Sequence, residues 1–199
     1  MTRSLQLAAH GAGLCAKAQR LGGALAGLLL LACAGVPREV HEPRPYPETK
    51  LAASSMALEV VDSRPAPQSA TTRQLLLPSD FEARGQQRLN GMLAGQGPSL
   101  QVIAYVNDGT ALDLEDARGE MTRVLVKLEF EVKVQDGPQL RRARSESSSD
   151  LPRDEATPEE LALLLRSTSL DAFDRYWADP KTTAALNADV AAYSQRAAK

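Results

Sequence analysis

The sequence predicts a two-layer α+β domain, in which a mainly antiparallel sheet of about four strands carries helices packed on one face. The clearest observation is the alternation of apolar and polar side chains over residues 124–134, which is typical of a strand with one buried and one wet face. Segments with helical spacing of apolar residues precede and follow the strands, at 79–95 and 157–178. The order strand, helix, antiparallel strands, helices predicts a single domain over residues 56–199.

The domain is expected to open with one strand and one helix. Residues 56–61 predict a short strand, and a loop rich in Pro, Gln, Ser and Thr follows over 65–78. Ser79-Asp80-Phe81-Glu82 matches a capping box, so we expect a helix that begins there and ends at Gly95. Glycines inside this helix weaken it by about 1 kcal/mol each relative to alanine. A close approach to the sheet is the expected compensation.

The other strands follow this helix. Residues 100–106 predict a strand, with a turn at Asn107-Asp108-Gly109 and a looser segment that holds a short edge strand at 111–114. Asp136-Gly137 predicts a hairpin turn after the long alternating strand. Residues 139–147 then return as its polar antiparallel partner.

The C-terminal part of the chain predicts two helices. Residues 145–156 are polar, and we expect a loop there. Thr157-Pro158-Glu159-Glu160 supplies a cap, a proline at the first helical position and a glutamate three residues after the cap. The resulting helix extends to Ala178, because Asp179-Pro180 interrupts it. A weaker helical stripe covers residues 181–196.

The N-terminal segment has the pattern of a secretory signal peptide. Basic side chains without any acid precede an uncharged run rich in Leu, Ala and Gly over residues 21–32, which is too short to span a bilayer. This run ends in Leu30-Leu31-Ala32-Cys33, which resembles the lipobox of bacterial lipoproteins. The resemblance implies cleavage after Ala32 and acylation of Cys33 on its sulfur and its new amino group. An ordinary secretory signal with a chance cysteine, or a buried helix behind a wrongly assigned start, remains the alternative.

This leader divides the chain into three expected segments. Residues 1–32 are the signal peptide, residues 33–55 are the lipidated cysteine with a proline-rich tether, and the domain follows. Two or three acyl chains anchor a protein firmly, whereas one binds marginally. By analogy with enteric bacteria, Ala34 after the cysteine favours the periplasmic face of the outer membrane.

The composition excludes several classes of function. A net charge of −2 and a pI near 5.8 argue against nucleic-acid binding. After cleavage only His41 remains, inside the tether, so we expect no Ser–His–Asp or Cys–His catalytic site, no zinc site and no cofactor. The acidic cluster Asp113, Glu115 and Asp116 lacks EF-hand spacing, and a solvated loop is the expected reading.

The candidate binding residues lie on the returning strand and the long helix. Arg142 and Arg144 point to one side of the strand and Arg141 to the other. We expect cross-strand ion pairs with the acids of the strand opposite, and contact with an anion or a partner as the alternative. Tyr176 and Trp177 point in different directions, so one is expected in the core and the other, Trp177, as an exposed partner contact.

Several of these motifs together resemble the YajG-like lipoproteins. The resemblance runs from Cys33 to about Asn187 and rests on three motifs: Val60-Val61-Asp62-Ser63-Arg64 at the end of the first strand, the alternating strand at 124–134, and Asp179…Ala185-Leu186-Asn187. The same outline recurs in the lipopolysaccharide-assembly lipoprotein and in auxiliary lipoproteins of lipid-transporting ABC systems. It implies envelope binding or assembly and no catalysis.

The expected function is therefore a lipid-anchored accessory module that binds an envelope protein or a glycolipid. A glycan-acting enzyme with two carboxylates, and a purely structural envelope protein, are the alternatives. The polar strand at 139–147 is a candidate sheet edge, which would augment the sheet of a partner or of a second copy.

Overall fold

The computed structural model describes residues 44–65, 72–117 and 119–199, which lie in a compact unit spanning residues 40–199. The predictions for the leader, including Ala32, Cys33 and His41, fall outside the described residues. The elements are β1 (Ser55–Asp62), β2 (Thr72–Gln74), α1 (Phe81–Asn90), β3 (Ser99–Asp116), β4 (Gly119–Val134), β5 (Gln139–Pro152), a 3₁₀ turn (Arg153–Glu155), α2 (Pro158–Trp177) and α3 (Pro180–Ala197).

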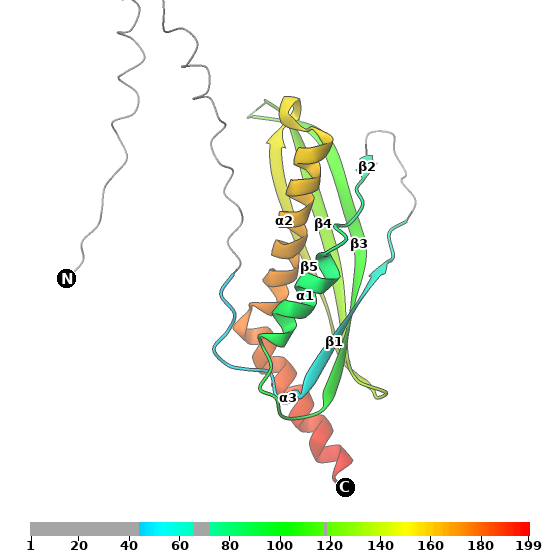
Figure 1. Ribbon diagram of the computed structural model, residues 1–199, viewed down its shortest axis with the longest axis vertical. Coiled ribbons are helices and arrows are strands. Elements are labelled where there is room, and N and C mark those ends of the chain that lie inside the picture. Colours follow the sequence, from blue (N-terminus) through cyan, green and yellow to red (C-terminus); the bar gives the residue numbers. More distant parts are fainter. Residues whose placement is uncertain (1–43, 66–71, 118) are drawn as a thin grey trace, which may run out of the picture. The chain divides into compact units, whose positions relative to one another are not determined.

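The architecture is α+β with helices on one face of an open sheet, as predicted (Figure 1). The strand order is β1-β3-β4-β5, and the short strand β2 pairs with the far part of β3. β1 runs parallel to β3, with α1 as the crossover between them, and all other pairs are antiparallel. The sheet has five strands because the expected loop at 65–78 contains β2.

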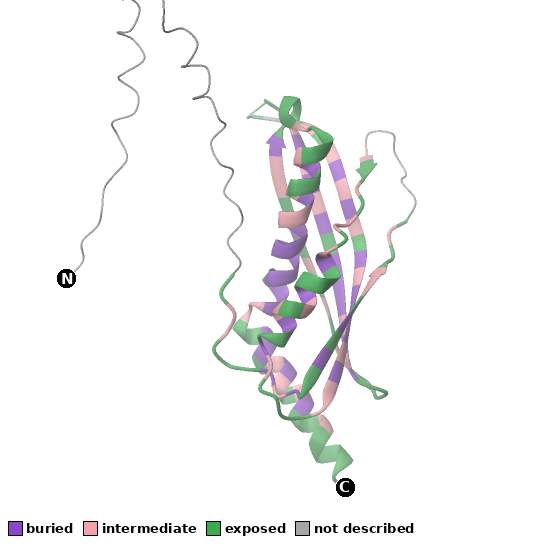
Figure 2. Ribbon diagram, in the orientation of Figure 1, coloured by how far each residue is buried: buried purple, intermediate pink, exposed green. Residues whose placement is uncertain are grey.

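The core forms between the helices and the alternating residues of the strands. Along β4 the residues from Val124 to Val134 that face the helices are all buried, as the alternation predicts. Figure 2 shows this alternation on the strands and the concentration of buried residues in the C-terminal half of α2. At the centre, the ring of Phe130 packs edge-on against Phe173 and stacks on Tyr176 at a centroid distance of 5.0 Å.

Trp177 belongs to this aromatic cluster, and its prediction as an exposed partner contact is wrong. Its side chain is fully buried and packs against Phe130, Phe173 and Tyr176. Tyr176 is 8 % exposed, so both neighbours are buried. Two adjacent helical residues are both buried here because α2 is enclosed near its C-terminus, where Tyr46 of the N-terminal segment bonds to Asp174.

The glycine of α1 explains how this helix fits on the sheet. A Cβ atom at Gly85 would lie 2.6 Å from Leu58 Cδ2 and 3.1 Å from the Phe173 ring. The predicted close approach is therefore confirmed at this position. The predicted capping box is wrong, since α1 begins at Phe81 behind Asp80, whose carboxylate pairs with Arg84 and Arg166. The helix also ends earlier than expected, at Asn90.

The strands β3 and β5 are longer than predicted. The expected turn at 107–109 is a β-bulge, where the register shifts between Val106 and Asp108 and the strand continues to Asp116. Residues 145–152, expected as a loop, extend β5 instead. Their serines face α2: Ser145 Oγ donates to Ala172 O at 2.6 Å and Ser147 Oγ to Asp171 Oδ2 at 2.5 Å. Small hydroxyl side chains thus let the helix and the edge strand approach.

The folded domain also begins earlier than predicted. Leu51 and Ala53, placed in the tether by the sequence, are buried, and Tyr46 packs against the core. Asn187 of α3 holds this segment, because its side chain accepts from Ala52 N–H and donates to Lys50 O. The two C-terminal helices agree with prediction. Thr157 caps α2 by accepting from Glu160 N–H, and Asp179 caps α3.

Candidate functional site on the uncovered sheet face

Within the described residues, one face of the sheet carries no helix, and we call it the uncovered face. It is formed by the residues that alternate with the core residues: Glu59 of β1, Gln101 and Tyr105 of β3, Lys127, Glu129 and Glu131 of β4, and Arg142, Arg144 and Glu146 of β5. Acidic and basic side chains alternate across these strands. This face contains both arginines that the sequence singled out as binding candidates.

Glu129 is the centre of the charged network on this face. Its side chain is 7 % exposed, although no helix covers it, because its neighbours enclose it. Arg144 Nε donates to Glu129 Oε2 at 2.9 Å, and Arg142 forms an ion pair with Oε1. The hydrogen bond from Arg144 lowers the pKa of Glu129, and the charge of Arg142 acts in the same direction. The carboxylate is therefore fixed as an anion between two guanidinium groups.

The two arginines use only part of their binding capacity on Glu129. The Arg144 side chain is 82 % exposed and that of Arg142 is 55 % exposed. Arg142 also lies over the ring of Tyr105, at 5.8 Å from the guanidinium carbon to the ring centroid. A guanidinium has five N–H donors, so each arginine still presents donors to solvent. The predicted cross-strand pairing is confirmed, and it leaves this surface able to bind a further group.

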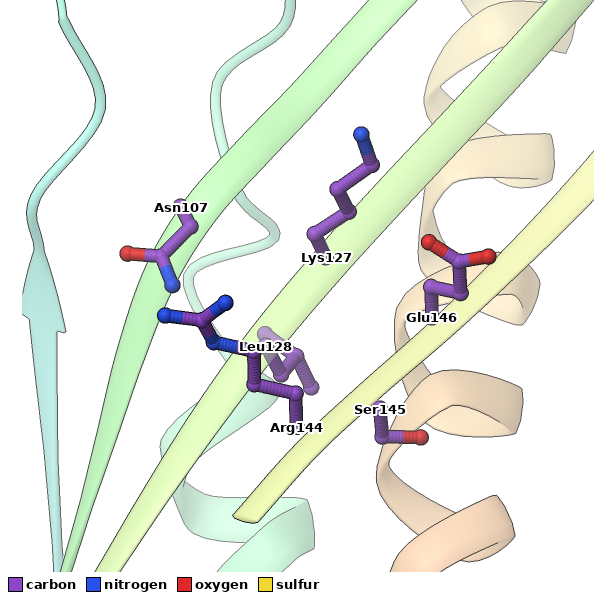
Figure 3. A pocket seen from close by; sticks show the side chains of 6 residues that line it. All are labelled: Asn107, Lys127, Leu128, Arg144, Ser145 and Glu146. Carbon is purple, nitrogen blue, oxygen red and sulfur yellow. The ribbon is translucent and has the colours of Figure 1, made fainter. Parts of the chain in front are cut away.

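A pocket opens beside this network between β3, β4 and β5 (Figure 3). Its volume is about 490 Å³, and its lining residues are Asn107, Lys127, Leu128, Arg144, Ser145 and Glu146. In Figure 3 the amide of Asn107 and the guanidinium of Arg144 point toward each other. Asn107 Nδ2 donates to Glu129 Oε2 at 3.4 Å. The mixture of cationic, anionic and amide groups suits a polar ligand or a protein surface rather than an apolar molecule.

A two-residue turn at Asp136-Gly137 would place Gln135 opposite Pro138 and, counting back along both strands, Glu129 opposite Arg144. The structure has Glu129 opposite Arg144, but the turn is longer, because Lys133 pairs with Gln139 and Val134 N–H donates to Pro138 O. A register shift between Val132 and Lys133 compensates for the longer turn. The position of Asn107 in the pocket does not follow from the sequence, because Asn107-Asp108-Gly109 has the composition of a turn and forms a bulge instead.

The third arginine of the returning strand points to the other face, as predicted. Arg141 Nε donates to Asp189 Oδ2 of α3 at 2.8 Å. It therefore ties β5 to the last helix and takes no part in the uncovered face. The predicted acidic cluster lies on β3 instead of in a loop, where Asp113 accepts from Thr122 and pairs with Arg73 and Arg153. These bonds lower the pKa of Asp113, with the hydrogen bond from Thr122 as the main cause.

The Val61-Asp62-Ser63-Arg64 motif at the end of β1 supports the bulge next to the pocket. Arg64 has a side chain only 5 % exposed, which pairs with Asp62 and donates to Leu75 O and Gly109 O. Ser63 Oγ lies 2.8 Å from Asn107 Oδ1 and donates to Val106 O. The hydrogen bond from Arg64 lowers the pKa of Asp62. The motif thus positions Asn107, which is a role the sequence did not indicate.

A second carboxylate cluster lies on the helix side and was also missed. Asp174 of α2 is fully buried, pairs with Arg88 of α1 and accepts from Tyr46 Oη at 3.0 Å. Burial, followed by the charge of Asp174, raises the pKa of the Tyr46 phenol, which stays protonated. The signal that could have revealed this cluster is an aspartate on the buried face of the helix predicted at 157–178, because buried charges are paired.

Two further properties concern metals and membranes. Among residues 44–65, 72–117 and 119–199, no cluster of His, Cys, Asp and Glu has the arrangement of a metal site. None of the helices in this part of the chain is long and apolar enough to cross a bilayer.

Comparison with known proteins gives distant structural likenesses only. No protein-family model matches the sequence, and no curated protein matches it. The fold is similar to the minor lipoprotein of Acinetobacter baumannii (TM-score 0.42, 14 % identity, 64 % of this chain and 92 % of that one). It is also similar to a predicted lipoprotein from Caulobacter crescentus CB15 (TM-score 0.32, 13 % identity, 71 % and 92 %). These structural neighbours are bacterial lipoproteins, and likenesses this low transfer no function to the present chain.

Proposed function

We propose that this chain is a lipid-anchored envelope lipoprotein of the YajG-like type, whose domain is a non-catalytic accessory module. In this proposal Cys33 carries the lipid, and the uncovered face binds an envelope protein on the periplasmic side of the outer membrane. The observation that carries the binding role is the network around Glu129, in which a fixed anion holds two arginines that extend into solvent. The lipobox at Leu30–Cys33 supports the anchoring role.

The network favours a protein partner for a physical reason. Its acidic and basic groups are interleaved, so a simple anion such as a lipid phosphate meets repulsion from Glu129 and Glu146 beside the attraction of the arginines. A protein surface supplies both signs of charge and satisfies the network at several points. Glycolipid binding therefore needs contacts beyond Arg142 and Arg144.

The enzymatic alternative gains no support from Glu129. A carboxylate-dependent glycan-acting enzyme needs one acid whose pKa is raised so that it stays protonated. The pKa of Glu129 is lowered instead, because both arginines stabilise its charged form. This residue does not provide the general acid.

The anchor is tested by mass spectrometry of the mature N-terminus from membranes. We expect a triacylated peptide that begins at Cys33, and we expect the Cys33→Ala variant to remain unprocessed and to lose membrane attachment. Separation of inner and outer membranes by density then locates the protein. An unmodified Cys33, or cleavage elsewhere, would contradict the anchoring proposal.

The binding role is tested by photo-cross-linking in cells. A photoreactive amino acid at position 144 reports on the uncovered face, and the same group at Gln195, exposed on α3, is the matched control. We expect a discrete cross-linked protein at position 144 that is absent at position 195. Equal cross-linking patterns at both positions would count against the uncovered face as the binding surface.

A further inference from the structure

The two outer edges of the sheet differ in how their backbone groups are occupied. On the outer side of β1, the Gln86 side chain of α1 accepts from Leu58 N–H at 2.7 Å and donates to Met56 C=O at 2.8 Å. These are the bonds that a neighbouring strand would make. Gln86 therefore closes this part of the β1 edge against strand pairing.

The β5 edge has no such closure within the described residues. It ends the strand order, and in that part of the chain no strand pairs with its outer side. β5 is 14 residues long and has no proline or glycine before its last residue. Natural sheets protect exposed edges by short strands, prolines, bulges or charged side chains. The register of β5 shifts only near its start, between Gln139 and Arg141, so the rest of the strand carries charges but no bulge. Ser148 is exposed on this stretch, whereas Ser147 is buried beside a pocket of about 230 Å³ that Arg44 and Asp171 also line.

We propose that the β5 edge pairs with the β5 edge of a second copy of this chain, antiparallel, across a two-fold axis at Ser145. A two-fold axis perpendicular to a sheet places one residue opposite its own copy, and all other pairs follow by counting along the strands. With Ser145 on the axis, Arg144 of each copy lies opposite Glu146 of the other. The pairing therefore forms two equivalent ion pairs on the uncovered face.

The charges along β5 favour this register over those in which the two-fold axis passes through Arg144, Glu146 or Ser147. An axis at Arg144 or at Glu146 would place two like charges in direct opposition. An axis at Ser147 would pair Arg144 with Asp150, which Arg123 already holds through two hydrogen bonds of 2.7 and 3.0 Å. Glu146, in contrast, is exposed and forms no ion pair with a described residue, and Arg144 retains free donors beside Glu129.

The other face of the strand is compatible with the same register. Next to the axis only small side chains meet on the helix side, since Ser145 would lie opposite Ser145 and Ala143 opposite Ser147. Farther out, Arg141, which is held by Asp189 of α3, would lie opposite Ser149. The hydroxyls of Ser145 and Ser147 already bond to α2, so the pairing leaves no polar group unsatisfied there. The inference does not depend on lipid attachment or on the partner proposed above.

The test is a charge exchange in the full-length chain purified in detergent. Native mass spectrometry over a concentration series measures the monomer–dimer equilibrium of the wild type, Arg144→Glu, Glu146→Arg and the double variant. Each single change turns two attractions into two repulsions, so we expect the dissociation constant to rise about tenfold or more. The double variant restores opposite charges, and its constant should return to within about threefold of the wild type.

Glu59→Arg on β1 is the matched control, because it makes the same charge change at the opposite edge and should leave association unchanged. Thermal unfolding of each variant shows whether the fold is retained. Glu146→Arg, which leaves the pair between Arg144 and Glu129 intact, keeps the test valid if Arg144→Glu and the double variant that contains it destabilise the chain. A wild type that stays monomeric, single variants that associate like the wild type, or a double variant that stays dissociated would each overturn the proposal.

Discussion

Two carboxylates of this domain are each held by cations, but one lies under the helices and the other on the uncovered face. Asp174 is fully buried, and its cation Arg88 has a side chain only 17 % exposed. Glu129 is almost as buried, yet its cations are 55 % and 82 % exposed. The first arrangement joins α1, α2 and the N-terminal segment and has no access to a ligand. The second fixes the anion and leaves the cations free, which is the arrangement expected of a binding surface.

Asp174→Ala gives the largest expected effect. It leaves Arg88 buried without its counter-ion and Tyr46 without its acceptor. Breaking a buried pair by removing one partner typically costs about 3–5 kcal/mol. Urea denaturation measures the change in the free energy of unfolding. Asp189→Ala, which removes the half-exposed pair with Arg141, is the control and should cost about 1 kcal/mol or less. Similar losses in both variants would remove the distinction between the two clusters.

Tyr46→Phe separates the hydrogen bond from the ion pair of the same cluster. The change removes the phenol that donates to Asp174 Oδ1 and keeps the ring. An unsatisfied buried acceptor costs about 1–3 kcal/mol, so the loss should be smaller than for Asp174→Ala. The same denaturation experiment measures it, with Tyr193→Phe on α3 as the control. No loss would mean that the segment at 44–53 is held by its apolar contacts alone.

Glu129→Gln tests the uncovered cluster and its dependence on pH. Because its arginines are solvated, we expect a loss of about 1 kcal/mol or less near neutral pH. The pKa of Glu129 is lowered on folding, so the stabilising contribution of its charge is present above the unfolded carboxyl pKa and lost as pH falls through the folded one. Unfolding curves of both proteins should therefore converge toward acid. A difference that grows toward acid would contradict the lowered pKa.

Arg144→Ala gives the smallest expected effect on stability, within about 0.5 kcal/mol, because surface side chains contribute little. Its effect should appear in binding instead, as weaker cross-linking to the proposed partner in cells. Arg73→Ala, which removes an exposed pair with Asp113 outside the uncovered face, is the matched control. If Arg144→Ala destabilised the domain as strongly as Asp174→Ala, the charged network around Glu129 would have a structural role, and this result would contradict the proposed binding role.

Period and capping signals predicted most of the fold. The alternation in β4, the Thr157 cap of α2 and the Asp179-Pro180 break are local features, and local interactions alone explain them. The errors have a common physical origin in tertiary contacts. Asn107-Asp108-Gly109 has turn composition, but Arg64 holds it as a bulge within a continuous strand. The serines after Arg144 have loop composition, but their hydrogen bonds to α2 extend the strand.

The candidate site was predictable in part. Strand geometry predicts Arg142 and Arg144, and counting from a two-residue turn gives Glu129 as their partner only because a register shift beside the hairpin compensates for a longer turn. Asn107 depends on the bulge, and the buried position of Trp177 depends on the segment that encloses α2. Neither follows from residue type, since both are set by parts of the chain far away in sequence.

The Gln86 side chain on β1 has a consequence for growth of the assembly. A domain with two open sheet edges can add copies at both ends and extend into a filament, whereas one open edge used symmetrically is consumed by the first pairing. With Leu58 N–H and Met56 C=O already bonded to Gln86, this part of the β1 edge is closed, and the proposed pairing through β5 is expected to end at two copies. The side-chain amide of Gln86 would then decide whether the assembly is a dimer or a growing filament.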